Sequence, residues 1–369
     1  TARLADAKFF WETDATRPLS ARTEALKNVL FHHALGSLAG KTRRIEKLSA
    51  KIAQAVGAPT PVCIRAASLC KADLVSGMVG EFPDLQGIMG RYLARHDGEP
   101  AAVARAIEEH YLPRHAGGAL PQSPAGQVLA LADRLDSLVG LFIAGEEPTG
   151  EKDPYGLRRA ALGVIRILVE KKLDLNVAAL VEDAADGYAS DGLVSGESAK
   201  SQCTTFILER YRALYTTLGF AQDEISAVLE AGASRPLDFD RRLKAVSRFR
   251  HHRDAPSLTA ANKRIRNILR KSEESIPAQI DAQQLTESAE IALSQAILKT
   301  AGAIAPAIAK GDYAAALRTL AGLRPVVDGF FDEVMVMSPD PAVRTNRLAL
   351  LGQLNQLFLG IADISLLQT

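Results

Sequence analysis

Helical periodicity runs through almost all of this 369-residue sequence and limits the folds that it can adopt. Apolar residues recur every three or four positions, whereas no convincing stretch alternates apolar and polar residues as a half-buried strand would. Clusters of proline and glycine, such as GAPTPV at 57–62, interrupt the pattern. The sequence therefore predicts an all-α protein in three blocks: an N-terminal domain at 1–150, a helical connecting block at 151–235 and a C-terminal helical bundle at 236–369.

The composition is that of a folded soluble protein, with 47% apolar and 24% charged residues. The longest apolar run, at 289–309, contains Glu290, Lys299 and Pro306, so we do not expect it to span a membrane. The three cysteines form no CxxC pair, which fits a reducing cytoplasm and argues against a structural zinc site. We therefore expect a cytoplasmic protein with no membrane partner. Because the sequence begins at Thr1 rather than at a methionine, we also expect it to be part of a longer protein.

The stretch HHALGSLAGKT, from His32 to Thr42, ends in a way that is similar to a phosphate-binding loop. Such a loop needs four residues between its glycines, but only three separate Gly36 from Gly40. Neighbouring histidines on a helix point about 100° apart and cannot bind one metal ion together. The apolar spacing around the stretch predicts an ordinary helix that binds neither nucleotide nor metal, with Lys41 as a surface charge.

Basic residues are concentrated in one segment of the chain. Residues 241–271 contain eleven lysines or arginines and one acidic residue, a net charge of +10, while the rest of the chain has 33 basic and 42 acidic residues, a net charge of −9. A local excess of positive charge on an otherwise acidic protein indicates an anion-binding face, with nucleic acid as the leading partner.

The segment AIEEHYLPRHAGGALPQSPAGQVLALADRLDSLVGLF, at 106–142, resembles the second half of an HD domain, a helical fold of metal-dependent phosphohydrolases. The resemblance implies that His110 and Asp133 stand where that family binds divalent metals, with Asp136 further along the same helix face. The first half departs from the pattern: Lys71 lies near the expected His-Asp pair, and a protonated lysine cannot ligate a metal. We therefore expect a degenerate HD domain without bound metal, in which His110 and Asp133 are remnants. An active HD-type phosphohydrolase is the alternative.

Longer strings carry a second resemblance over nearly the whole chain. They are similar, in the same order, to the β subunits of bacterial glycyl-tRNA synthetases: ARLADAKFFWETD, KADLVSGMVGEFPDLQGIMGRYLARHDGE, GEEPTGEKDPYGLRRAALGVIRIL and VVDGFFDEVMVMSPDPAVRTNRLALLGQLNQLFLGIADIS. The resemblance implies roughly the C-terminal two thirds of such a subunit, within a heterotetramer of two α and two β subunits. In that family the α subunit resembles a class II catalytic domain, and the β subunit supplies much of the tRNA binding.

The residues themselves agree with a non-catalytic role. The sequence contains no dinucleotide-binding loop, phosphate-binding loop or class I synthetase signature. We therefore expect a tRNA-binding part of a glycine–tRNA ligase, with no catalytic residue or cofactor of its own. Its expected partners are glycine tRNA and the α subunit, where ATP and magnesium would bind. A helical adaptor with no nucleic-acid role is a further alternative.

The C-terminal block resembles the helical-bundle anticodon-binding domain of arginyl- and cysteinyl-tRNA synthetases. In SLTAANKRIRNILRK, at 257–271, the residues opposite the apolar stripe are expected to bind RNA: Lys263, Arg264, Asn267, Arg270 and Lys271. Further along, Arg344, Asn346 and Arg347 are candidates for contact with phosphates or with unstacked bases. The alternative for the first group is a solvated helix face. For the arginines it is ion pairing with Asp328, Asp332 or Glu333. Phe330 and Phe331 are expected in the core rather than as base-stacking platforms.

Overall fold

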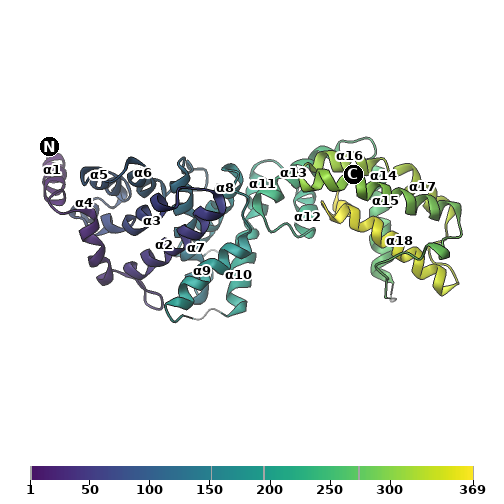
Figure 1. Ribbon diagram of the computed structural model, residues 1–369, viewed down its shortest axis with the longest axis horizontal. Coiled ribbons are helices and arrows are strands. Elements are labelled where there is room, and N and C mark those ends of the chain that lie inside the picture. Colours follow the sequence, from purple (N-terminus) through teal and green to yellow (C-terminus); the bar gives the residue numbers. More distant parts are fainter. Residues whose placement is uncertain (1, 151, 194–195, 273–274, 369) are drawn as a thin grey trace. The chain divides into compact units, whose positions relative to one another are not determined.

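The computed structural model describes residues 2–150, 152–193, 196–272 and 275–368, and it is helical almost throughout, as expected (Figure 1). The contacts divide the chain into two compact units. Unit 1 comprises residues 1–210 and 235–237, and unit 2 comprises residues 211–234 and 238–369. The block expected at 151–235 is thus divided between the two units, and its helices pack with the core of one unit or the other.

Unit 1 is built from α-helices of 5 to 20 residues, several 3-10 helices (η) and one small hairpin. Its elements are α1 (Ala2–Asp14), η1 (Leu19–Asn28), β1 (Leu30–His32), β2 (Gly36–Ser37), α2 (Leu38–Val56), α3 (Thr60–Leu69), η2 (Ala72–Val75), α4 (Gly77–Glu81), η3 (Pro83–Leu85), α5 (Ile88–His96), α6 (Ala101–Glu109), α7 (Pro124–Ile143), α8 (Leu157–Glu170), α9 (Val177–Ser190) and α10 (Glu197–Leu208).

Helix α7 is the central helix of unit 1 and contacts α2, α3, α6, α8, α9 and α10 (Figure 1). Its sequence is apolar on nearly every face, so it can be surrounded by other helices. The helix begins where Ser123 caps it by accepting a hydrogen bond from the Gly126 amide. Gly140 permits close packing against α9, because a Cβ atom there would lie 2.0 Å from the Tyr188 hydroxyl. Asp136 of this helix lies in the interior of unit 1, whereas the side chain of Asp133 is 15% exposed.

The stretch from His32 to Thr42 is not the continuous helix that its apolar spacing predicted. Leu30–His32 and Gly36–Ser37 form a two-stranded antiparallel hairpin, and Gly36 has the positive φ of 85° that the turn requires. Helix α2 begins only at Leu38, after the Ser37 hydroxyl has accepted a hydrogen bond from Gly40. The prediction was wrong because a turn glycine followed by a capping serine outweighs hydrophobic spacing.

Unit 2 is a bundle of helices, the longest of which, α15, has 22 residues. Its elements are α11 (Arg210–Thr217, from its second residue), α12 (Gln222–Glu230), α13 (Pro236–Arg250, from its third residue), α14 (Ala255–Lys271), η4 (Ala282–Gln284), α15 (Ser288–Ala309), α16 (Tyr313–Ala321), α17 (Arg324–Glu333), α18 (Pro341–Leu359) and η5 (Ile364–Leu366).

Helix α15 is long and apolar enough by length and composition to cross a membrane. In unit 2 it packs against α16, α17 and α18. Its Glu290 is fully buried and forms an ion pair with Arg347 of α18. These contacts make α15 part of the bundle, although only 28% of its most apolar 18-residue window is buried. That α15 does not span a membrane stays a prediction.

Candidate functional site

Lys71 lies where the HD resemblance would place metal chemistry. It follows α3, and its ammonium group is 2.9 Å from His110 Nε2 at the end of α6 and 2.9 Å from Asp133 Oδ2 on α7. The side chain is 6% exposed, and the ammonium group lies 4.4 Å from the centre of the Tyr111 ring. The backbone carbonyl of Ile107 faces His110 Nδ1, so we assign the ring proton to Nδ1, which leaves Nε2 to accept from Lys71.

A second ammonium group completes the cluster. Lys41, on the first turn of α2, lies 3.1 Å from Asp133 Oδ1 and 3.1 Å from Asp136 Oδ2, and it donates to the Ser137 hydroxyl at 2.7 Å. Lys41 is only 4% exposed, so the expectation of a surface charge was wrong. The reason is that the first turn of α2 packs against α7, which brings this lysine among carboxylates.

Asp136 is held from its other side by helices α2 and α9. Arg44 donates to Asp136 Oδ1 at 2.7 Å, and the Tyr188 hydroxyl donates to the Asp136 carbonyl at 2.8 Å. Arg44 also reaches Asp191 at 3.0 Å and stacks on the Tyr188 ring at 4.0 Å. The Lys41–Lys71 cluster, defined as these two lysines with His110, Asp133 and Asp136, is therefore part of a buried network that joins five helices or helix ends.

The charges of this cluster fix its protonation. Burial alone would raise the pKa of Asp133, but the ammonium groups of Lys41 and Lys71 outweigh it and hold that pKa well below its usual range. Burial and the charge of Lys71 together hold the pKa of His110 well below its ordinary value of 6.5. Asp133 is therefore ionised and His110 neutral near pH 7.

These residues do not fit a divalent metal. A metal would need the His110 nitrogen and the Asp133 oxygens as ligands, but both already contact the Lys71 ammonium, whose charge would repel the ion. Among the described residues, no group of three or more His, Cys, Asp or Glu side chains is arranged to hold a metal ion. Nothing in this geometry supports the alternative of an active phosphohydrolase.

The RNA-binding residues expected on α14 lie on its exposed face. Leu258, Ala261 and Ile265 are buried as expected, whereas Ile268 and Leu269 are half-buried. All five candidate side chains are exposed: Lys263, Arg264, Asn267, Arg270 and Lys271. Arg264 lies 4.2 Å over the ring of the half-buried Phe331, while Phe330 is fully buried, so only Phe330 is a core residue in the sense expected.

Much of the positive charge between residues 241 and 271 is neutralised within unit 2. Arg242 and Lys244 form ion pairs with Asp238 and Asp240 one turn earlier on α13. Arg250 and Arg266 pair with Asp223 and Glu230 of an earlier part of the chain. In the described parts of the chain, no ion pair within 4.0 Å is found for six of the eleven basic residues: Arg241, Arg248, Lys263, Arg264, Arg270 and Lys271. Arg241 and Arg248, both exposed on α13, were not predicted individually, although their helical spacing of seven residues was a usable signal.

The candidates on α18 have contacts within unit 2. Arg347 is 6% exposed, pairs with Glu290 and donates to the Met335 carbonyl at 2.7 Å. Asn346, also 6% exposed, exchanges hydrogen bonds with the backbone of Asp281 at 2.8 and 3.0 Å. The expectation that these two residues contact RNA is therefore corrected: both side chains are buried and bind other parts of unit 2.

Arg344 is half-buried and donates to the Ser338 carbonyl at 2.8 Å, so it remains the one partly accessible candidate on α18. The alternative partners Asp328, Asp332 and Glu333 were also wrong for Arg347, since its carboxylate partners are Glu287 and Glu290 of α15. The acidic residues nearest in sequence are thus not the nearest in space.

Comparison with known proteins matches two regions of the chain to family models. Residues 1–230, more than half of the chain, match the family model described as glycyl-tRNA synthetase beta subunit. The chain belongs to this family. Residues 258–364, which include most of α14 and all of α18, match the model of the DALR anticodon binding domain.

Individual relatives support the same assignment. The chain is 48% identical to the glycine–tRNA ligase beta subunit of Aeromonas hydrophila over 366 residues, and to that of Pseudomonas aeruginosa over 365 residues. Each match covers 99% of this chain and 53% of the relative. The chain thus spans about half the length of these beta subunits, a smaller share than the two thirds expected.

Proposed function

We propose that this chain is a tRNA-binding, non-catalytic part of a glycine–tRNA ligase beta subunit. Membership of the beta-subunit family supports this proposal, and so does the match of unit 2 to an anticodon-binding domain. The observation that carries it is the exposed face of α14, where four basic residues have no acidic partner among the described residues: Lys263, Arg264, Arg270 and Lys271. Such a face is suited to RNA phosphates, which arginine binds with two parallel hydrogen bonds and lysine with a single point charge.

In this proposal, aminoacylation takes place on another subunit. ATP, magnesium and glycine would bind to a partner α subunit, and this chain would hold glycine tRNA for it within a heterotetramer in the cytoplasm. Unit 1 would contribute its shape and surface rather than metal-dependent chemistry, because Lys71 contacts the two side chains that a metal would need as ligands.

Filter binding of glycine tRNA to single alanine variants tests the assignment. Replacing Lys263, Arg264 or Arg270 should weaken binding and lower the slope of log affinity against log salt by about 0.7 to 0.9 per lost phosphate contact. Lys51 is the matched control, since its charge is already cancelled by Asp183 at 2.6 Å and Asp186 at 3.0 Å. Binding that is unchanged in all three variants would refute the role of α14.

A further inference from the structure

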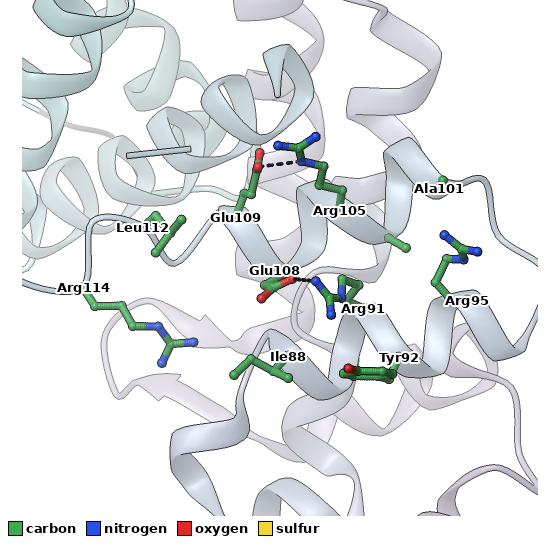
Figure 2. A pocket seen from close by; sticks show the side chains of 11 residues that line it. Ile88, Arg91, Tyr92, Arg95, Ala101, Arg105, Glu108, Glu109, Leu112 and Arg114 are labelled. Carbon is green, nitrogen blue, oxygen red and sulfur yellow. Dashed lines mark hydrogen bonds and ion pairs between the residues drawn. The ribbon is translucent and has the colours of Figure 1, made fainter. Parts of the chain in front are cut away.

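Four arginines converge on a pocket of unit 1 that lies apart from the Lys41–Lys71 cluster. The pocket is formed by α5, α6 and the segment after α6, and it encloses about 760 Å³, within the range of small-molecule sites. Figure 2 shows Arg91 and Arg95 on α5, Arg105 on α6 and Arg114 beyond it, with Arg114 and Arg95 toward opposite ends of the view. We call it the arginine pocket.

The two acidic residues of the arginine pocket are already used. Glu108 pairs with Arg91 at 2.6 Å, and Glu109 pairs with Arg105 at 2.8 Å. Glu109 also accepts hydrogen bonds from the amide and hydroxyl of Ser123, at 2.8 and 2.6 Å, and so it is bound to the start of α7. Neither carboxylate is available to balance the remaining arginines.

Two guanidinium groups are left without a counter-charge. Within the described residues, Arg95 has no carboxylate at ion-pair distance, and Arg114 donates only to the backbone carbonyls of Asp84 and Gln86. Both side chains are exposed at the pocket. The pocket therefore carries a net charge of about +2, with uncompensated cations toward each end and a neutral ion pair between them.

Apolar and aromatic side chains line the rest of the arginine pocket. Ile88, Leu112 and the exposed Tyr92 ring contribute to its walls, and Arg91 lies 4.9 Å over that ring. A surface that combines guanidinium groups with an exposed aromatic ring suits a ligand that has phosphates and a flat base. An inorganic anion alone would leave the apolar walls in water.

We propose that the arginine pocket binds nucleotides that carry more than one phosphate, with Arg95 and Arg114 on phosphates and Tyr92 against a base. The same chemistry is offered by a free nucleoside polyphosphate and by successive nucleotides of an RNA strand, and the experiment separates these sources. The site does not depend on the proposed role of α14, because it lies wholly within unit 1.

The single tryptophan of the chain provides a probe of the pocket. Trp11 of α1 lies edge-on to Tyr92, with ring centres 6.5 Å apart, and edge-on to His96 at 5.9 Å. A ligand that moves or covers Tyr92 should therefore alter Trp11 fluorescence excited at about 295 nm, a wavelength that tyrosine does not absorb.

The chain is titrated with ATP, with pyrophosphate and with tRNA, in buffer without magnesium. For wild type we expect a saturable change in Trp11 fluorescence. Arg95→Ala and Arg114→Ala should each weaken binding roughly tenfold, as for the loss of one hydrogen bond to a charged group. Glu108→Gln should strengthen binding, because it releases Arg91 from its ion pair. Arg43, whose side chain is 72% exposed outside the pocket, provides the control Arg43→Ala.

A response to ATP that the arginine variants lose would identify a free nucleotide as the ligand. A response to tRNA alone, lost in the same variants, would identify an RNA strand. No Trp11 response to any probe, or equal affinity in wild type, Arg95→Ala and Arg114→Ala, would overturn the proposal. So would an equal loss in Arg43→Ala. Thermal unfolding of each variant, followed by circular dichroism, establishes that the comparison is between folded proteins.

Discussion

Replacing Lys71 with methionine tests whether the Lys41–Lys71 cluster stabilises unit 1. The change keeps an unbranched apolar side chain, one atom shorter, but removes the ammonium group, so Asp133 loses one of its two cations and His110 Nε2 loses its donor. Removing one partner from a buried pair costs about 3–5 kcal/mol. Because Lys41 still lies 3.1 Å from Asp133, we expect the lower end, about 3 kcal/mol. For a unit of this size the melting temperature should fall by about 6–12 °C.

Urea unfolding followed by Trp11 fluorescence measures this loss, since the only tryptophan lies in unit 1 and reports on that unit alone. Lys51→Met is the matched control: its ion pairs are as short, but the side chain is 46% exposed, so it should cost no more than about 1 kcal/mol. Asp133→Asn is also introduced into the wild-type chain and into Lys71→Met. The resulting double-mutant cycle should give a coupling of about 1–3 kcal/mol between Lys71 and Asp133. If Lys71→Met cost no more than Lys51→Met, the cluster would not stabilise the fold.

Three further results are expected. The purified chain alone should give no glycine-dependent pyrophosphate exchange, and measurable exchange would contradict the proposed division of labour. Arg347→Ala should destabilise unit 2 by about 3–5 kcal/mol, because it leaves Glu290 buried without its cation, whereas Arg344→Ala should cost less than about 1 kcal/mol in the same thermal unfolding assay. Burial would raise the pKa of Glu109, but hydrogen bonds from Ser123 and Arg105 lower it overall. Its carboxylate therefore stabilises the fold above the unfolded pKa of about 4.3, and that stability is lost as pH falls through the lower folded pKa. Glu109→Gln should thus be less stable than wild type by about 1–3 kcal/mol at pH 7, and the difference should shrink below about pH 4 in urea titrations; a constant difference would show that this carboxylate is not the cause.

The sequence was most informative where one physical effect dominated. Helical spacing in 257–271 predicted both the buried side of α14 and the exposure of its five polar candidates, because the helix lies at the surface and only one face packs. The departure of Lys71 from the HD pattern likewise predicted that the metal positions would not fit a metal. The structure adds that Lys71 itself contacts both His110 and Asp133.

The sequence was least informative about partners from distant segments. Nothing near Arg347 identified Glu287 and Glu290 as its partners, since they precede it by more than fifty residues and meet it only when α15 and α18 pack. Lys41 was misassigned for the same reason, because its carboxylates are on α7. Both errors concern buried charges, whose partners are determined by tertiary packing rather than by local sequence.

The two lysines of the cluster also constrain how unit 1 can change by mutation. A metal ion can dissociate or be chelated, whereas a lysine ammonium is covalently attached and is present in every molecule at any metal concentration. Losing one lysine would leave a buried carboxylate short of positive charge, and losing both would leave Asp133 with no cation unless a metal arrived at once. Metal-dependent chemistry at this place would therefore require several simultaneous substitutions, each of which destabilises the fold alone.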